Sequence, residues 1–165
     1  MTDEVKIQLT ALDAILGDLP YAVTLSDLTV PDCPLIYMNR KFKDMTGSTH
    51  RQLGQNCRYL QGDFDNYNTR LEIRRALFGE DRTQVILRNR RLNREPFFNM
   101  LMLETMGRIG VFSKLVLGVQ FELPESEALH LLRDVEATQT WGIRNKDILD
   151  HALRLRLDQR RTVMD

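Results

Sequence analysis

Apolar side chains recur at helical spacing near the start of the chain. Those that lie three or four positions apart, and so share one helix face, are Val5, Leu9, Leu12 and Leu16. Gly17 follows directly, and glycine commonly ends helices. The pattern predicts an N-terminal amphipathic helix whose apolar face packs on the domain or on a partner.

Short apolar runs between turn-rich segments predict strands in the middle of the chain. Two of these runs flank the turn-rich residues 27–34 and predict a strand pair: residues 21–26 and 35–38. Three longer runs come later: residues 83–89, 97–105 and 113–122. The loops that join the later runs are short, which favours antiparallel pairing. In the first of these loops, Asn93 is expected to adopt the left-handed conformation.

Two short helices are expected between the two groups of strands. Asn39 is positioned to cap the first helix, which ends at Gly47. Asn68 is positioned to cap the second helix, which ends at Gly79. Two strands, short helices and three further strands are typical of an α+β domain. The expected architecture is a five-stranded antiparallel sheet with short helices on one face and flanking helices at both ends.

Apolar residues recur at helical spacing again beyond the last predicted strand. One stripe consists of Leu129, Leu132 and Val135, and a second consists of Ile148, Leu149, Ala152 and Leu153. Gly142, next to Trp141, marks the expected break between two helices. The chain is therefore divided into an N-terminal flanking helix (1–18), a central domain (19–123) and a C-terminal helical extension (124–165) for signal relay or dimerisation.

Composition and charge favour an ordinary globular protein. Of the 165 residues, 42% are apolar and 28% charged, and 23 basic residues balance 23 acidic ones. Because the net charge is zero, no overall field attracts nucleic acid, and nucleic-acid binding is not expected. No apolar stretch is long enough for a bilayer, and the acidic N-terminus lacks a secretory pattern. We expect a cytoplasmic protein that does not contact membranes.

Reactive side chains are few. Cys33 and Cys57 do not form a CxxC pair, and free thiols are expected. The histidines show no spacing typical of metal ligands, so no metal site is predicted. No acid–base or nucleophile–base arrangement is evident, and the chain is not expected to be an enzyme.

One segment, residues 54–62, carries the most specific signal. Its sequence, GQNCRYLQG, resembles the signature of LOV (light-oxygen-voltage) domains, the blue-light-sensing branch of the PAS family, whose usual form is Gly-x-Asn-Cys-Arg-Phe-Leu-Gln. Tyr59 stands in place of the usual Phe, and its hydroxyl needs a partner if it is buried. Upstream, residues 31–37 resemble the family's Pro-Asp-Asn-Pro segment, with Cys33 in place of the Asn and without an assigned photochemical role.

The resemblance covers residues 19–123 and implies a bound flavin. Arg58 and Arg74 match the two arginines that hold the flavin phosphate. Asn89 and Asn99 match asparagines that bond the polar edge of the ring, and Gln120 matches the glutamine that faces flavin N5. Other residues expected around the cofactor are Asn56, Gln61, Leu60, Leu101, Leu103 and Val119. The compact phosphate pair favours FMN over FAD.

The chemistry of these side chains agrees with the resemblance. Amide side chains supply both donors and acceptors for the ring edge, and guanidinium groups suit a phosphate. Cys57 supplies a soft nucleophile, which the resemblance implies bonds to flavin carbon C4a after excitation, while N5 becomes protonated. Gln120 can answer that protonation by rotating its amide.

The expected function is a short blue-light photoreceptor without a separate effector domain, because residues 124–165 are too few to form one. The terminal helices are expected to form a homodimer whose association changes with light, and the sequence identifies no downstream partner. Two alternatives remain open, a flavin redox protein without adduct formation and a PAS interaction module without photochemistry.

Overall fold

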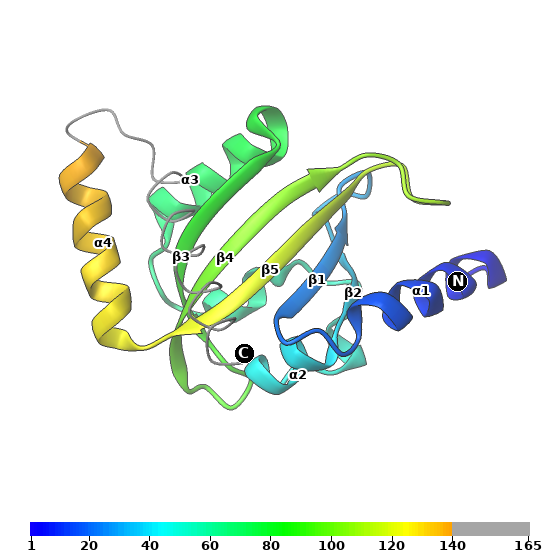
Figure 1. Ribbon diagram of the computed structural model, residues 1–165, viewed down its shortest axis with the longest axis horizontal. Helices are drawn as coiled ribbons and strands as arrows, with labels where there is room; N and C mark the ends of the chain where they lie inside the picture. The colour runs from blue at the N-terminus through cyan, green and yellow to red at the C-terminus, as the bar shows by residue number, and fades with distance from the viewer. Residues whose placement is uncertain (140–165) are drawn as a thin grey trace, which may run out of the picture.

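A five-stranded antiparallel sheet is the framework of the protein. The computed structural model describes the backbone of residues 1–139 and the side chains of residues 1–133. The strands are β1 (Ala22–Asp27), β2 (Leu35–Met38), β3 (Arg82–Arg90), β4 (Pro96–Met106) and β5 (Leu115–Leu123). Their order across the sheet is β2-β1-β5-β4-β3, with every neighbouring pair antiparallel (Figure 1). The predicted α+β architecture is therefore confirmed.

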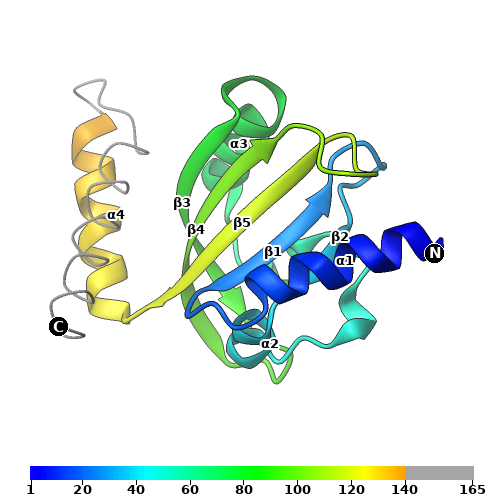
Figure 2. The same cartoon turned by 45° about the vertical axis from the view of Figure 1, so that its right-hand side comes forward.

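The short helices and the flanking helices occupy opposite faces of this sheet. Within the described residues, the α-helices are α1 (Asp3–Leu16), α2 (Arg40–Thr46), α3 (Tyr67–Arg75) and α4 (Glu125–Gln139). Three shorter elements are η1 (His50–Gln52), η2 (Cys57–Gln61) and a π-helical turn, η3 (Ala76–Glu80). Figure 2 shows α1 crossing in front of β1 and β2, whereas α3 lies behind β3 and β4.

Strand alternation determines which residues face the short helices. Neighbouring side chains of a strand point to opposite faces. In β5, Val116 and Gln120 face a cavity beneath the short helices. Val119 and Phe121 instead pack in a core cluster on the other face, together with Leu131 and other residues of α4.

The N-terminal helix packs on the domain, which is one of the two predicted possibilities. The apolar stripe of α1 contacts a cluster around Leu25 and Leu115, which lie on the face away from the cavity. The helix begins at Asp3 because the Thr2 hydroxyl accepts a hydrogen bond from the backbone N–H of Val5 at 3.3 Å. Ile7 and Ile15, on the outer side of α1, are 70% and 71% exposed.

The prediction of the first short helix is confirmed, whereas the predicted start of the second short helix was wrong. Asn39 caps α2, and Gly47 ends it in the left-handed conformation. The second helix, α3, begins at Tyr67, so Asn68 lies inside it and does not cap it. Asn66 precedes the helix, but its amide bonds the backbone of Arg88 in β3, twice at 3.1 Å. The competing contact with the sheet therefore sets where α3 begins.

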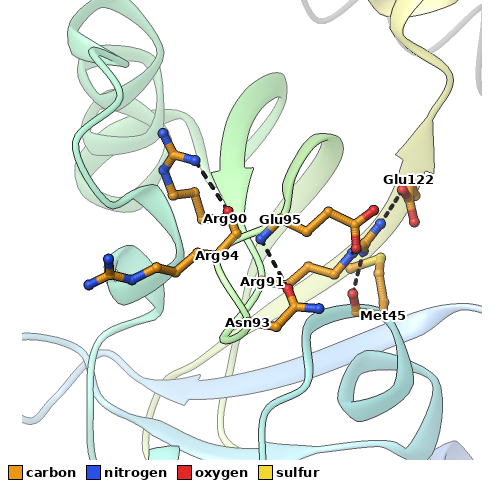
Figure 3. A network of polar contacts seen from close by, with 7 residues as sticks. All are labelled: Met45, Arg90, Arg91, Asn93, Arg94, Glu95 and Glu122. Atoms are coloured by element: carbon orange, nitrogen blue, oxygen red, sulfur yellow. Dashed lines mark hydrogen bonds and ion pairs between the residues drawn. The ribbon is translucent and has the colours of Figure 1, made fainter.

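The β3–β4 turn also differs from the prediction in one residue. Arg94, and not Asn93, adopts the left-handed conformation, with a φ of 74°. The Asn93 side chain instead accepts a hydrogen bond from the Glu95 N–H at 3.0 Å (Figure 3). An asparagine that bonds the backbone two residues on forms a local turn by itself, which moves the left-handed position to the next residue. Arg90 then donates to the Arg94 carbonyl at 3.2 Å.

Arg91 connects this turn to two other elements (Figure 3). Its guanidinium donates to the carbonyl oxygen of Met45 in α2 and pairs with Glu122 of β5. It also bonds Glu95 at 3.3 Å and lies 4.5 Å from the ring centre of Phe97. The turn, α2 and the end of β5 are thereby held together by one side chain.

The C-terminal helix contacts the sheet through part of its predicted stripe. Leu132 packs on the sheet, and Ala128 and Leu131, which are not in that stripe, do so as well. Leu129 is 45% exposed in the single chain. The Val135 side chain, Trp141, Gly142 and the whole second stripe lie outside the described residues. The division into 1–18, 19–123 and 124–165 stays a prediction.

Candidate functional site

One cavity between the sheet and the short helices gathers every predicted site residue except Val119. The predicted residues that line it are Asn56, Cys57, Arg58, Leu60, Gln61, Arg74, Asn89, Asn99, Leu101, Leu103 and Gln120. They come from η2 and the residue that caps it, from α3 and from three strands, so segments far apart in sequence meet here. The prediction that Val119 lines the cavity was wrong. Val119 neighbours Gln120 on β5, so its side chain faces the other side of the sheet.

Three buried amides form a connected row across the sheet side of the cavity. The Asn99 amide nitrogen donates to Asn89 Oδ1 at 3.1 Å and to Gln120 Oε1 at 2.8 Å. Gln120 in turn donates from Nε2 to the hydroxyl of Thr24 at 3.3 Å. All four side chains are almost completely buried. Buried amides that are joined in this way are held in a defined orientation toward the cavity.

This row of amides contains one hydrogen-bond acceptor without a donor. Among the described residues, Asn99 Oδ1 has no hydrogen-bond partner although it is buried. A buried acceptor without a partner costs about 1–3 kcal/mol. A ligand with an N–H group flanked by carbonyls would supply both the missing donor and further acceptors for the amides. The imide edge of a flavin ring has this composition, so these residues fit a flavin.

Cys57 faces the cavity from the start of η2. Asn56 caps this short helix through its side-chain oxygen, which accepts from the Arg58 N–H at 2.9 Å. Burial, with a smaller contribution from the neighbouring Cys33 thiol, raises the pKa of Cys57 to about 12. The group is therefore a neutral thiol near pH 7, and it needs an activated partner to react.

Tyr59, the residue of the 54–62 motif that departs from the family pattern, is accommodated by a local network of hydroxyl groups. The Tyr59 hydroxyl lies 2.7 Å from the hydroxyl of Ser48, which lies 2.7 Å from that of Thr46. Burial is the main reason that the pKa of Tyr59 is raised to about 12. The expected need for a hydroxyl partner is met.

Three arginines from the short helices line the cavity. Arg58 comes from η2, and Arg70 and Arg74 come from α3. Arg58 pairs with Asp32, which a bound anion would have to share or displace. Arg70 was missed from the sequence, although its position four residues before Arg74 puts both on one helix face. Guanidinium groups that line one cavity suit a phosphate.

The walls are more extensive than the sequence indicated. Beside the predicted leucines, the apolar lining includes Ile73, Leu77, Leu87 and Val116. The alternation of β3 and β5 could have identified Leu87 and Val116, which lie two and four residues from Asn89 and Gln120. Cys33 also lines the cavity, and no sequence signal indicated its position there.

Neither a metal-binding cluster nor a membrane-spanning helix is found in the described part of the chain. Within residues 1–139, the histidine, cysteine and acidic side chains do not gather in groups that could hold a metal ion. Every helix in the same range is too short or too polar to span a bilayer.

Comparisons with known proteins identify the family. The model of the PAS domain matches residues 20–118. The solved structure of the LOV protein of Rhodobacter sphaeroides is 34% identical and aligns over 94% of this chain and 99% of its own, with a TM-score of 0.68. Blue-light-activated histidine kinase 2 of Erythrobacter litoralis (strain HTCC2594) is 31% identical over 113 residues, which are 68% of this chain and 33% of the kinase.

A second kinase of the same bacterium, blue-light-activated histidine kinase 1, is 41% identical over 80 residues, 47% of this chain and 22% of the kinase. The chain thus spans a third or less of the length of these two kinases, both of which are named as blue-light-activated. The agreement of the PAS match with the LOV protein and the blue-light kinases shows that the chain belongs to the PAS domain family and, within it, to the LOV domains of blue-light photoreceptors.

Proposed function

We propose that this LOV domain binds FMN in the cavity and senses blue light through a reversible bond between Cys57 and the flavin. The observation that carries the proposal is that the Cys57 thiol and the amides of Asn89, Asn99 and Gln120 line one cavity. The open acceptor of Asn99 supports a ligand with an imide N–H. The apolar walls around Leu60 and Leu101 suit the body of a flat ring system.

FMN is proposed over FAD because of the charge that lines the cavity. Arg58, Arg70 and Arg74 supply three positive charges, against one negative charge from Asp32. A terminal phosphate of FMN carries enough negative charge to bind several guanidinium groups. These arginines would hold the phosphate while the amides hold the ring edge.

The chemistry of the proposed bond requires only the thiol and a light-excited flavin. Cys57 loses its S–H bond and gains a bond to flavin carbon C4a, and the proton ends on N5. The raised pKa of Cys57 agrees with a reaction that starts from the neutral thiol. The reverse steps in the dark restore both groups, so the protein senses light without releasing a product. The proposed role is therefore sensory and not enzymatic.

Gln120 is the proposed link between this bond and the rest of the protein. Its Oε1 accepts from Asn99 and its Nε2 donates to Thr24. When flavin N5 gains a proton, it changes from an acceptor to a donor, and rotation of the Gln120 amide would restore a matching bond. Gln120 lies on β5, and only Pro124 separates that strand from α4.

The output is proposed to be a change in a homodimer formed by the terminal helices. Ile7 and Ile15 of α1 and Leu129 of α4 are large apolar residues that are exposed in the single chain. Light scattering in darkness and after blue light should give a mass above that of one chain, with a difference between the two states. A monomer of constant mass would contradict this part of the proposal.

Two matched alanine variants test the role of Cys57. Cys57→Ala and Cys33→Ala each remove one thiol from the same cavity. We expect both purified proteins to be yellow, but only Cys33→Ala to lose its blue absorption band on illumination and regain it in the dark. A Cys57→Ala variant that bleaches and recovers like the wild type would indicate a flavin redox protein instead. A colourless wild-type protein would favour the PAS interaction module.

A further inference from the structure

The cavity contains a second thiol that the proposed function does not use. Cys33 and Cys57 are the two cysteines of the chain, both are free, and both line the cavity. They are 24 positions apart in the sequence, but the backbone segments that carry them run side by side. The contacts between these segments determine how the two thiols lie relative to one another.

Hydrogen bonds join the two segments on both sides of the cysteines. On one side, the Leu35 N–H donates to the Gln55 carbonyl and the Gly54 N–H donates to the Leu35 carbonyl, each at 2.8 Å. On the other side, the Asn56 side-chain amide donates to the Asp32 carbonyl oxygen at 2.7 Å, and the Asp32 carboxylate pairs with Arg58.

Asp32 links the two segments next to the cysteines. It directly precedes Cys33, and it bonds both residues that flank Cys57: Asn56 through its carbonyl oxygen and Arg58 through its carboxylate. Both thiols also line the same cavity. Disulfides join cysteines whose Cα atoms are about 4.4–6.8 Å apart, which requires neighbouring segments of this kind.

Two further observations concern the position of Cys33. Cys33 lies in a tight turn, in which Asp32 and Cys33 have φ angles of 72° and 46° and Cys33 N–H bonds the Val30 carbonyl at 3.0 Å. The Cys33 thiol is close enough to contribute to the raised pKa of Cys57.

We propose that Cys33 and Cys57 form a reversible disulfide within one chain, which makes the cavity a thiol redox site. The oxidant is a small disulfide such as oxidised glutathione. The two cysteines lose their S–H bonds and gain one S–S bond, while the S–S bond of glutathione breaks and takes up both hydrogens as two thiols. A dithiol reductant reverses the reaction.

The consequence for light sensing rests on the proposed function. When Cys57 is part of the disulfide, it has no free thiol that could bond to the flavin. Oxidation would therefore switch the photoreceptor off. Burial, with smaller contributions from Asp27 and Asp32, raises the pKa of Cys33 to about 11, and the pKa of Cys57 is about 12. Because thiolates are the reacting species, exchange is expected to be slow near pH 7 and faster as the pH rises toward 11.

The test is to equilibrate the dark protein in glutathione buffers of increasing oxidised fraction and to measure its mass under non-reducing conditions. We expect the wild type to lose the mass of two hydrogen atoms, to stay a single chain on a denaturing gel and to resist thiol alkylation. Cys33→Ser and Cys57→Ser are the matched controls, and each is expected to show only a mixed disulfide with glutathione. If the wild type gives only glutathione adducts or cross-linked chains, the proposal is wrong.

The same samples separate this proposal from the proposed function. The amplitude of the light-induced bleaching should fall in proportion to the oxidised fraction and return after reduction, while Cys33→Ser should keep its amplitude unless glutathione is attached to Cys57. If the internal disulfide forms but the reduced protein does not bleach, the photochemical proposal fails and the redox site stands. If bleaching is normal and no internal disulfide forms, the redox proposal fails alone.

Discussion

Replacing Asn99 with leucine tests whether the amide row binds the flavin ring. Asn99 is 1% exposed, lines the cavity and has the open acceptor. Leucine has the same number and branching of side-chain heavy atoms, although its methyl groups are bulkier, so Asn99→Leu removes the polar groups without opening a hole. The substitution removes the group that would accept from the flavin imide, and it also removes the donor to Gln120 and Asn89.

The size of the effect follows from the cost of an unpaired buried group. Without Asn99 Oδ1, the imide N–H of a bound flavin is desolvated and has no acceptor. Such a group costs about 1–3 kcal/mol. Since about 1.4 kcal/mol corresponds to a tenfold change in affinity, the dissociation constant for FMN should rise by about 5–150-fold.

Equilibrium dialysis of flavin-free protein against FMN measures this constant. Asn68→Leu is the matched control, because it makes the same substitution at an exposed position of α3 outside the cavity lining. We expect the control to bind FMN as the wild type does. If Asn99→Leu keeps its affinity within about twofold of wild type while its circular dichroism shows a folded protein, the assignment of the amide row to the flavin edge is wrong.

Three further predictions concern other parts of the cavity. A Cβ atom at Gly118 would lie 2.6 Å from the Thr24 hydroxyl, so Gly118→Ala should lower the free energy of unfolding by about 1–3 kcal/mol in urea titrations; an unchanged midpoint would contradict the crowding. Arg74→Ala should weaken FMN binding but leave riboflavin binding, which involves no phosphate, unchanged. The control Arg75→Ala, on the same helix but outside the cavity lining, should change the binding of neither ligand. If Arg74→Ala weakened FMN and riboflavin binding equally, that result would argue against a phosphate site. Burial raises the pKa of Cys57 from its ordinary value of 9.0 to about 12, so folding disfavours the thiolate. The stability of the wild type relative to Cys57→Ala should therefore be constant below pH 9 and fall as the pH rises from 9 toward 12, and a constant difference across this range would refute the raised value.

The motif and the strand pattern predicted most of the site because each is a local property of the sequence. Residues 54–62 carry the thiol and the cap, and the alternation of the strands determines which side chains face the cavity. Alternation also explains the one error in the lining. Val119 was placed beside Gln120 in the cavity, although adjacent strand residues cannot face the same side. Helical spacing would likewise have identified Arg70 from Arg74.

Features that depend on contacts between distant segments could not be predicted in this way. The start of α3 depends on bonds between Asn66 and Arg88, which no local preference reveals. The approach of Cys33 to Cys57 depends on hydrogen bonds that join segments far apart in the chain. The left-handed residue of the β3–β4 turn, Arg94, is set by the side-chain bond of its neighbour Asn93.

The absorption spectrum of the purified, reduced protein before and after blue illumination is the most direct test of the central claim. A reversible bond from Cys57 predicts that the blue band of a yellow protein disappears in the light and returns fully in the dark without added reagents. A protein that is colourless, or whose blue band is unchanged by illumination, would contradict the claim.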